Sequence, residues 1–300
     1  MEFHQLNIVL VGKTGHGKSA TGNTLVGASK FSEASGFSSC TTLEESQLTR
    51  FENIDIHVFE TPGFYDTRFN DQPEAADIGA KLRQINSFLA TVSETGGVSA
   101  FFLVINITSR FTSEEVKTIT ALERIYGERV FKDFGVLVFT HKDSYTQDSL
   151  GERTGALGEL ISKFSGRVLL ISNKGKFSGE RMQFSKEMIR AALKLKRQRK
   201  MYTTRDYNFN QTVRSRFILE LHLESVKERL DSNIRNLERE IEVVETLDAF
   251  KAVYLLGRIK RLEEEIILEA KGTELLDVFR DRVRHLKMKL RRKPPIFQLL

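Results

Sequence analysis

The sequence has no tryptophan, one cysteine and four prolines among its 300 residues. The single Cys40 has no partner in the chain, so a scaffold of internal disulfides is excluded and a reduced protein is expected. With four prolines and 20 glycines, collagen-like and proline-rich low-complexity chains are excluded as well. Hydrophobic residues make up 40% of the chain, which is enough for a core, so wholesale disorder is not expected.

Long hydrophobic runs are also missing. The longest runs, residues 100–105 and 134–139, fall far short of the roughly 20 residues that a membrane-spanning helix needs. No signal-peptide, myristoylation or prenylation pattern is found at the ends of the sequence. We therefore expect a cytoplasmic protein, whose contact with intracellular membranes, where it occurs, is peripheral.

Positive charge is concentrated in the last third of the chain. Residues 190–300 hold 26 Lys/Arg against 17 Asp/Glu, whereas residues 1–189 carry a small excess of acid. Basic segments attract nucleic acid or anionic membranes, although a solvated helical face is the simpler interpretation. Nucleic-acid binding would need exposed aromatics interleaved with the basic residues, so we expect no nucleic acid as a partner. Peripheral, salt-sensitive contact with anionic lipid stays open.

Short apolar runs alternate with segments of helical periodicity over the first 190 residues. Such alternation indicates βαβ units, and hence a mostly parallel sheet with helices on both faces. The predicted strands are 6–11, 54–59, 100–107, 135–139 and 168–171, and the clearest predicted helices are 114–125 and 153–164.

After about Arg190 the pattern changes to a heptad-like seam, which predicts two or three long helices over residues 211–292. These helices could pair with one another, fold back on the first domain or form a coiled coil between chains. The expected architecture is an α/β P-loop NTPase domain over residues 1–205, followed by an all-α extension over residues 206–300.

A phosphate-binding motif follows the first predicted strand. Residues 12–19 read GKTGHGKS and fit the pattern G-x-x-x-x-G-K-[ST], with a helix expected from about Ser19. The glycines let successive backbone N–H groups and the helix N-terminus point at phosphate oxygens. Lys18 should reach the β- and γ-phosphates, and the Ser19 hydroxyl should bind Mg²⁺. The nucleotide contacts expected here are Gly12, Lys13, Thr14, Gly15, His16, Gly17, Lys18, Ser19 and Ala20.

A second motif, after the strand at 135–139, predicts which base is bound. The Asp143 carboxylate can accept two hydrogen bonds from guanine, whereas adenine would leave it unpaired at a cost of a few kcal/mol. The stem of Lys142 can lie along the base, and Asn173, after the last strand, can donate to it. The sequence therefore predicts GTP or GDP as the ligand, with base-side contacts from Thr140, His141, Lys142, Asp143, Ser172 and Asn173.

The expected switch elements differ from the usual GTPase pattern. Glu60 stands where an Asp is usual, and position 64 is Phe, so no Gln lies beside the attacking water. Gly63 could offer its N–H to the γ-phosphate. A hydroxyl near residue 40, best supplied by Ser38 and less well by Thr41 or Thr42, could complete the magnesium shell. The expected Mg²⁺ ligands are therefore Ser19, Ser38 and Glu60.

Taken together, these stretches resemble the AIG-type GTPases, the GIMAP family of immunity-associated nucleotide-binding proteins, which are similar to septins and chloroplast import-receptor GTPases. The resemblance covers about residues 5–200, with Glu60 and Ser38 as departures from the family pattern. It rests on Ile8–Asn23, Glu60–Thr67 and Phe139–Asp143, and most specifically on a box formed by Phe101–Ile105, Ser109–Glu115 and Leu122–Glu128.

The resemblance implies a mechanism in which GTP-loaded copies dimerise across the nucleotide face and hydrolyse GTP slowly. Arg110 falls at the arginine of the family box, where it is implied to act as an arginine finger across the dimer. His16 is a second candidate for contacting phosphate or the partner. The expected catalytic residues are therefore Arg110, His16 and Lys18.

Two other functions stay open. Glu60 and Phe64 are also compatible with a nucleotide-gated scaffold that assembles on GTP binding with negligible hydrolysis. A P-loop ATPase or kinase would need adenine binding, which Asp143 opposes, and a motif for a second substrate, which the sequence does not contain.

Overall fold

The computed structural model describes residues 5–32, 45–61, 88–90, 92, 94, 96–109, 113–144, 154–177, 179–198, 201–243, 249–270 and 276–293. Their contacts divide the chain into two compact units, and the division between Ser215 and Arg216 falls inside one long helix. It lies C-terminal to the predicted domain boundary at residue 205. Each unit has a hydrophobic core of its own.

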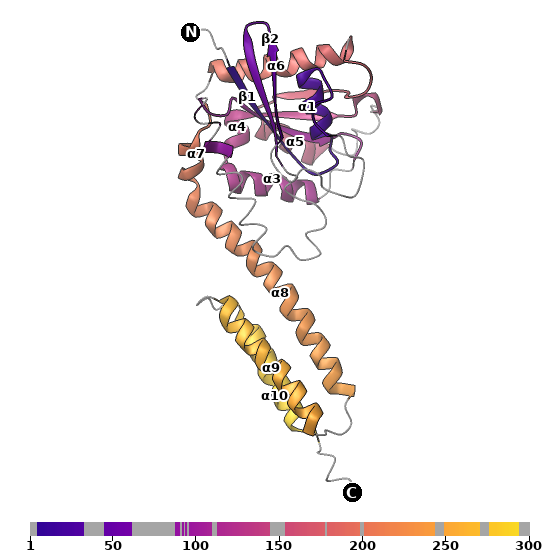
Figure 1. The fold of residues 1–300 in the computed structure, drawn as a ribbon, viewed down its shortest axis with the longest axis vertical. Coiled ribbons are helices and arrows are strands. Elements are labelled where there is room, and N and C mark those ends of the chain that lie inside the picture. Colours follow the sequence, from indigo (N-terminus) through magenta and orange to yellow (C-terminus); the bar gives the residue numbers. More distant parts are fainter. Residues whose placement is uncertain are drawn as a thin grey trace. The chain divides into compact units, whose positions relative to one another are not determined.

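The first unit is built on a six-stranded sheet with the order β2-β3-β1-β4-β5-β6 (Figure 1). Five strands are parallel, and β2 runs antiparallel to β3 at one edge. The strands are β1 (Gln5–Val11), β2 (Glu45–Phe51), β3 (Ile54–Glu60), β4 (Ala100–Asn106), β5 (Gly135–Thr140) and β6 (Val168–Leu170). The five predicted strands are all present, and the predicted α/β class of a mostly parallel sheet is confirmed.

The strand β2 was not predicted, and its sequence explains why. The segment ESQLTRF is polar, and its large apolar Leu48 is 64% exposed. As an edge strand, β2 pairs only with β3 and needs no continuous apolar run, unlike the buried inner strands. Apolar runs therefore identify the centre of this sheet and miss its edge.

Helices cover both faces of the sheet. On one face, α1 (Lys18–Val26) and α6 (Glu180–Gln198) pack on alternate side chains of β1, β3, β4 and β5. On the other lie α3 (Ser113–Tyr126), α4 (Val130–Phe134) and α5 (Thr154–Lys163) (Figure 1). Phe131 of α4 stacks on Phe164, which follows α5, with ring centroids 4.9 Å apart. A short helix, α7 (Thr204–Phe209), with the 3-10 turn η2 (Lys142–Ser144), completes the unit.

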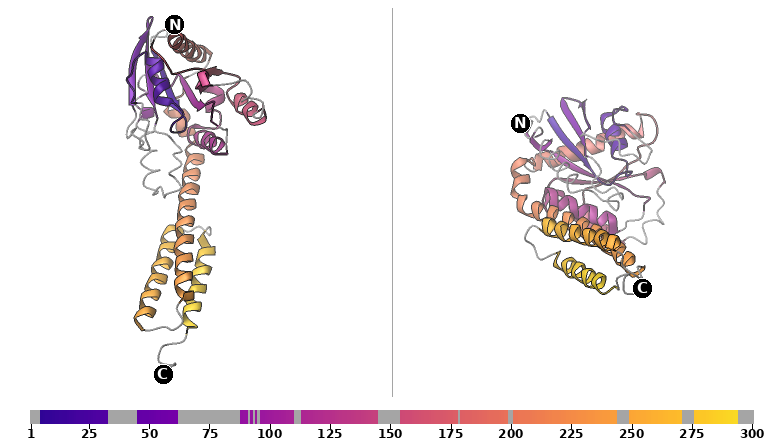
Figure 2. Two further views of the ribbon diagram at one scale, coloured as in Figure 1. Left: turned by 90° about the vertical axis from the view of Figure 1, so that its right-hand side faces the viewer. Right: turned by 60° about the horizontal axis from the view of Figure 1, so that its bottom comes forward.

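The second unit is a bundle of three helices, which confirms the expected all-α extension. The helices are α8 (Gln211–Val243), α9 (Ala249–Ala270) and α10 (Asp277–Arg291), and Figure 2 shows α9 and α10 lying along α8. The heptad-like seam of α8 is buried within the chain, against apolar side chains of α9 and α10. Ion pairs join the helices at their surfaces, such as Arg229 Nε with Glu265 at 2.8 Å. No helix in the described ranges combines the length and the apolar character needed to cross a bilayer.

The order of the parallel strands brings the predicted motifs together. The strand β1 lies between β3 and β4, so the direction of strand addition reverses there. In open α/β sheets, ligands bind outside the carboxyl ends of the strands at such a reversal. The segments after β1, β3, β5 and β6 all begin at this edge, and they carry the motif residues in the described part of the chain.

Candidate functional site

The loop between β1 and α1 has the backbone of a tight phosphate-binding turn. Gly12 has φ = 142°, and a Cβ there would lie 2.5 Å from the carbonyl oxygen of Val104 in β4. Gly17, at φ = 91°, is the residue that caps the N-terminus of α1. Both positions need glycine, because other side chains would be strained or would clash. The first-turn N–H groups of α1 therefore face the carboxyl edge of the sheet, where they can bind an anion.

Two oxygen atoms from different elements meet at the start of α1. The Ser19 hydroxyl donates to Glu60 Oε1 at 2.9 Å, because the register that aligns Leu10 with Glu60 places the end of β3 beside this turn. Glu60 is 3% exposed. The ammonium of Lys18, a buried side chain, donates to the carbonyl oxygen of Lys13 at 3.2 Å and so turns back over its own loop. Ala20 lies in the first turn of α1, and Thr14 and Gly15 are exposed at the tip of the loop.

His16 is buried under the loop. Its Nε2 lies 3.7 Å from Glu115 Oε1 of α3, and the Lys13 ammonium lies 3.9 Å from the same oxygen. Burial is the largest cause that lowers the pKa of His16 to about 4; Glu115 opposes it, and the nearby charges of Lys18 and Lys13 act in the same direction as burial. The imidazole is therefore neutral at pH 7 and faces the inside of the unit. A role in touching phosphate or a partner chain would need the loop to rearrange.

The first three residues of the base-side motif, Thr140 to Lys142, contact the phosphate loop and α6. The Thr140 hydroxyl donates to the carbonyl oxygen of His16 at 3.0 Å and ties the end of β5 to the phosphate loop. His141 follows at φ = 63°, and the Lys142 ammonium lies 3.2 Å from Glu180 and 4.8 Å from the centre of the Phe184 ring. These contacts hold Lys142 against the start of α6.

The carboxylate of Asp143 is held by residues that follow β6. It accepts hydrogen bonds from the Ser172 hydroxyl at 2.7 Å and the Ser144 hydroxyl at 3.1 Å, and it pairs with Lys174 at 2.5 Å. The Lys174 ammonium and then the Ser172 hydroxyl hold the pKa of this carboxyl well below its usual range. Asp143 is therefore an ionised, oriented acceptor at pH 7. Its Lys174 partner is 70% exposed.

Asn173 has both side-chain amide atoms bonded to α1. Its Nδ2 donates to the Thr21 hydroxyl at 3.1 Å, and its Oδ1 accepts from the Thr24 hydroxyl at 2.8 Å. The side chain thus points at α1, although the sequence predicts a donor aimed at the base. These two hydrogen bonds hold the loop after β6 against α1.

The structure adds residues that motif reading missed. Glu115, Thr21, Thr24 and Lys174 all contact the predicted site residues, but none of them belongs to a nucleotide motif. For Thr21 and Thr24, the one sequence signal is their spacing from Gly17, which places them on successive turns of α1. The predicted residues Arg110, Ser38 and Gly63 lie outside the described residues. Within the described ranges, no cluster of three or more His, Cys, Asp or Glu side chains could hold a metal ion.

Comparison with known proteins assigns the chain to a family. The sequence pattern of the AIG1 family matches residues 6–220, which include the whole phosphate loop and the base-side motif. The chain belongs to the AIG1 family. The predicted resemblance to AIG-type proteins is thereby confirmed.

Two curated proteins and one solved structure are similar to this chain. Immune-associated nucleotide-binding protein 10 of Arabidopsis thaliana is 29% identical over 279 residues, which cover 90% of this chain and 55% of that protein. GTPase IMAP family member 8 of Mus musculus is 31% identical over 178 residues, which cover 58% and 25%. The chain thus spans about half the length, or less, of these relatives. Toc33 of Arabidopsis thaliana in complex with GDP and Mg²⁺ has 17% identity and a TM-score of 0.49, with 67% of this chain and 88% of that chain covered.

The buried His16 predicts a pH dependence of stability. Its folded pKa, about 4, lies below the value of 6.5 for a free side chain, so the unfolded chain binds the extra proton between these values. The free energy of unfolding of the first unit should therefore fall as the pH is lowered from 7 to 4. The loss should be about 3 kcal/mol, and replacing His16 by Asn should remove it.

Urea unfolding at a series of pH values measures this difference. His285→Asn, at an exposed position of α10, is the matched control and should keep the wild-type slope. Equal slopes for His16→Asn and the wild type would contradict a buried neutral imidazole.

Proposed function

We propose that the chain binds GTP and GDP at the carboxyl edge of its sheet. The observation that carries this proposal is the Asp143 carboxylate, which is ionised, oriented by Ser172 and Lys174, and joined through Thr140 to the phosphate loop. A carboxylate in this position can accept two hydrogen bonds from guanine and none from adenine in the same pose. The names of the plant and mouse relatives, a nucleotide-binding protein and a GTPase, support the same function.

Phosphate binding follows from the other half of the site. The loop of residues 12–19 and the first turn of α1 would hold the phosphates, and Lys18 would leave the Lys13 carbonyl for a phosphate oxygen. Two hard oxygen ligands, Ser19 Oγ and Glu60 Oε1, lie 2.9 Å apart and suit Mg²⁺. Bound there, the ion would neutralise charge on the phosphates. Ser38 and Gly63 are assigned from the sequence pattern alone.

Hydrolysis of GTP is the finer part of the proposal. Slow turnover activated by dimerisation across the nucleotide face is favoured by the AIG1 family match and by Arg110 in the family box. The alternative is a scaffold that assembles on GTP binding and turns over negligibly. It is favoured by Phe64 in place of a water-positioning Gln and by the buried position of His16 against Glu115.

The choice of base is directly measurable. In calorimetry with Mg²⁺, the wild type should bind GDP on the order of 100-fold more tightly than ADP, since the unmatched carboxylate costs a few kcal/mol. Asp143→Asn should lose most of that preference, because an amide presents a donor to the guanine N–H groups. Asp55→Asn, at an exposed position of β3, is the control and should bind GDP like the wild type. Equal affinity for GDP and ADP would remove the proposal.

A second measurement separates the enzyme from the scaffold. If Arg110 acts across a dimer, GTP turnover per protein molecule should rise with protein concentration. Arg110→Ala should abolish the rise, with a loss of up to about 10³-fold. Arg190→Ala, exposed on α6, is the control with a similar change in charge. Turnover that stays negligible at every concentration, while a GTP analogue still drives dimerisation, would favour the scaffold.

A peripheral membrane contact is a second candidate function, supported by one end of the helical bundle. There α8 ends, α9 begins and α10 ends, and Lys289 and Lys293 reach Glu242 at 3.4 Å. We define the bundle tip as the exposed side chains at this end: Val243, Phe250, Val253, Arg291 and Arg292. The three apolar side chains are 80%, 85% and 71% exposed.

Basic residues beside exposed apolar ones suit an anionic lipid surface. Periodicity alone shows no apolar face here, because these side chains come together only at the ends of the helices. The contact proposed is therefore partly electrostatic and partly apolar.

Sedimentation with vesicles tests the bundle tip. The wild type should pellet with vesicles rich in phosphatidylserine and stay in solution with phosphatidylcholine alone, and high salt should reduce the pelleting. Arg291→Gln with Arg292→Gln should weaken binding about 30-fold, at about 1 kcal/mol for each charge. Phe250→Ser with Val253→Ser should remove the vesicle binding that remains at high salt.

The matched control, Ile267→Ser with Leu268→Ser, changes exposed residues at the other end of α9. Loss of binding in the control would show that the tip is not the contact.

A further inference from the structure

The loop after β6 is held by an arginine that belongs to no nucleotide motif. Arg181, in the first turn of α6, is 8% exposed, and its Nε donates to the Thr24 hydroxyl of α1 at 2.9 Å. Its Nη1 donates to the carbonyl oxygen of Gly175 at 3.0 Å, and its guanidinium lies 3.9 Å from the centre of the Phe177 ring. One planar group thus joins α1, α6 and the loop, because the guanidinium fork can donate in two directions while its face stacks on a ring.

This arginine extends the hydrogen bonds around Asn173. Thr24 accepts from Arg181 and donates to Asn173, and Asn173 donates to Thr21, whose hydroxyl donates to the carbonyl oxygen of Gly17 at 2.8 Å. A continuous chain of hydrogen bonds therefore runs from the start of α6 through the base-side loop to the residue that caps α1. We name this chain the loop clamp: Arg181, Thr24, Asn173, Thr21 and Gly17.

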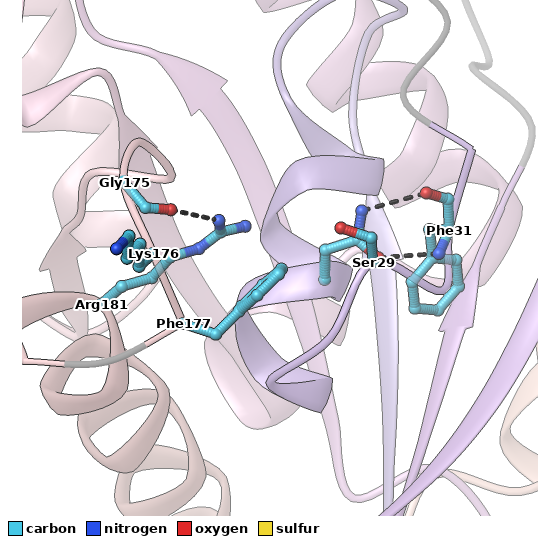
Figure 3. A pocket seen from close by; sticks show the side chains of 7 residues that line it. Ser29, Phe31, Gly175, Lys176, Phe177 and Arg181 are labelled. Atoms are coloured by element: carbon cyan, nitrogen blue, oxygen red, sulfur yellow. Dashed lines mark hydrogen bonds between the residues drawn. The ribbon is translucent and has the colours of Figure 1, made fainter.

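The clamp borders a pocket of about 510 Å³, shown in Figure 3. Ser29 and Phe31, after α1, form one side of the pocket, and Gly175, Lys176, Phe177 and Arg181 form the other. The figure shows the Arg181 guanidinium bonded to the Gly175 carbonyl on its own side of the pocket, close to Phe177. The loop has open space on this side, so the arginine contacts take the place of packing that would otherwise fix it.

We propose that Arg181 is a positioning residue for nucleotide binding, which fixes the base-side loop against α1 without touching the nucleotide. The inference rests on the proposed function, because the loop it holds carries Ser172, which orients Asp143. If the clamp is opened, Ser172 and the loop backbone can move away from the base while the phosphate loop stays in place. The base-side contacts should then fail before the phosphate contacts do.

Three variants test this role. Arg181→Met keeps the length of the side chain and its stacking on Phe177 but removes the hydrogen-bond donors. Arg181→Lys keeps the positive charge. Thr24→Val removes the hydroxyl that Arg181 and Asn173 both contact. We expect Arg181→Met and Thr24→Val each to release a fluorescent GDP analogue roughly tenfold faster than the wild type. Because both act on one chain of hydrogen bonds, the double variant should release the analogue little faster than either single variant.

Arg181→Lys should recover part of the loss. Arg190→Met, exposed on the same helix, should release GDP at the wild-type rate.

A second readout separates positioning from general support of the fold. Tripolyphosphate can occupy only the phosphate loop, so its affinity should be the same in Arg181→Met and the wild type. An equal loss of GDP and tripolyphosphate binding, or additive effects of Arg181→Met and Thr24→Val, would overturn the inference. A wild type that binds no guanine nucleotide would instead overturn the proposed function.

Discussion

The pairing of β1 with β3 on one side and β4 on the other is the constraint on which the rest of the first unit depends. Because all three strands are parallel, the residues after β1 and β3 must meet at one edge. The register sets Glu60 beside the first turn of α1, and it brings Gly12 against the Val104 carbonyl. A shift of one residue would turn the core side chains of a strand to the opposite face, so burial fixes the same register that builds the site.

The charges along this edge are divided between two halves. Lys13 and Lys18 lie on the side of the phosphate loop, where Glu115 offsets part of their charge and burial keeps His16 neutral. Asp143, on the side of β5 and β6, carries the negative charge and is kept ionised by Lys174. A guanine nucleotide has the opposite arrangement, with anionic phosphates at one end and N–H donors at the other. The polarity of the edge therefore favours one orientation of such a ligand.

The sequence predicts the elements of this site far better than it predicts the directions of the side chains. Glycine spacing and buried apolar runs locate the phosphate loop and β5, because backbone geometry and burial restrict which residues can stand there. Asn173 and His16 show the limit. Both lie in the expected loops, yet one bonds to α1 and the other packs against Glu115, since contacts between distant segments decide where a polar side chain points. Arg181 could not be found at all, because its partners come from three separate elements.

The helix α1 serves both halves of the edge. Its N-terminus faces the proposed phosphate site, and hydroxyls from its next turns hold the loop that would contact the base. A helix is stiff along its axis at 1.5 Å for each residue, so the distance between the two halves is set by the positions of Gly17, Thr21 and Thr24. The base-side loop has little regular structure of its own and is bonded to this helix through Asn173. The site can then contact both ends of one ligand without the free-energy cost of ordering the loop on binding. This is the advantage that a preformed site has over a flexible one.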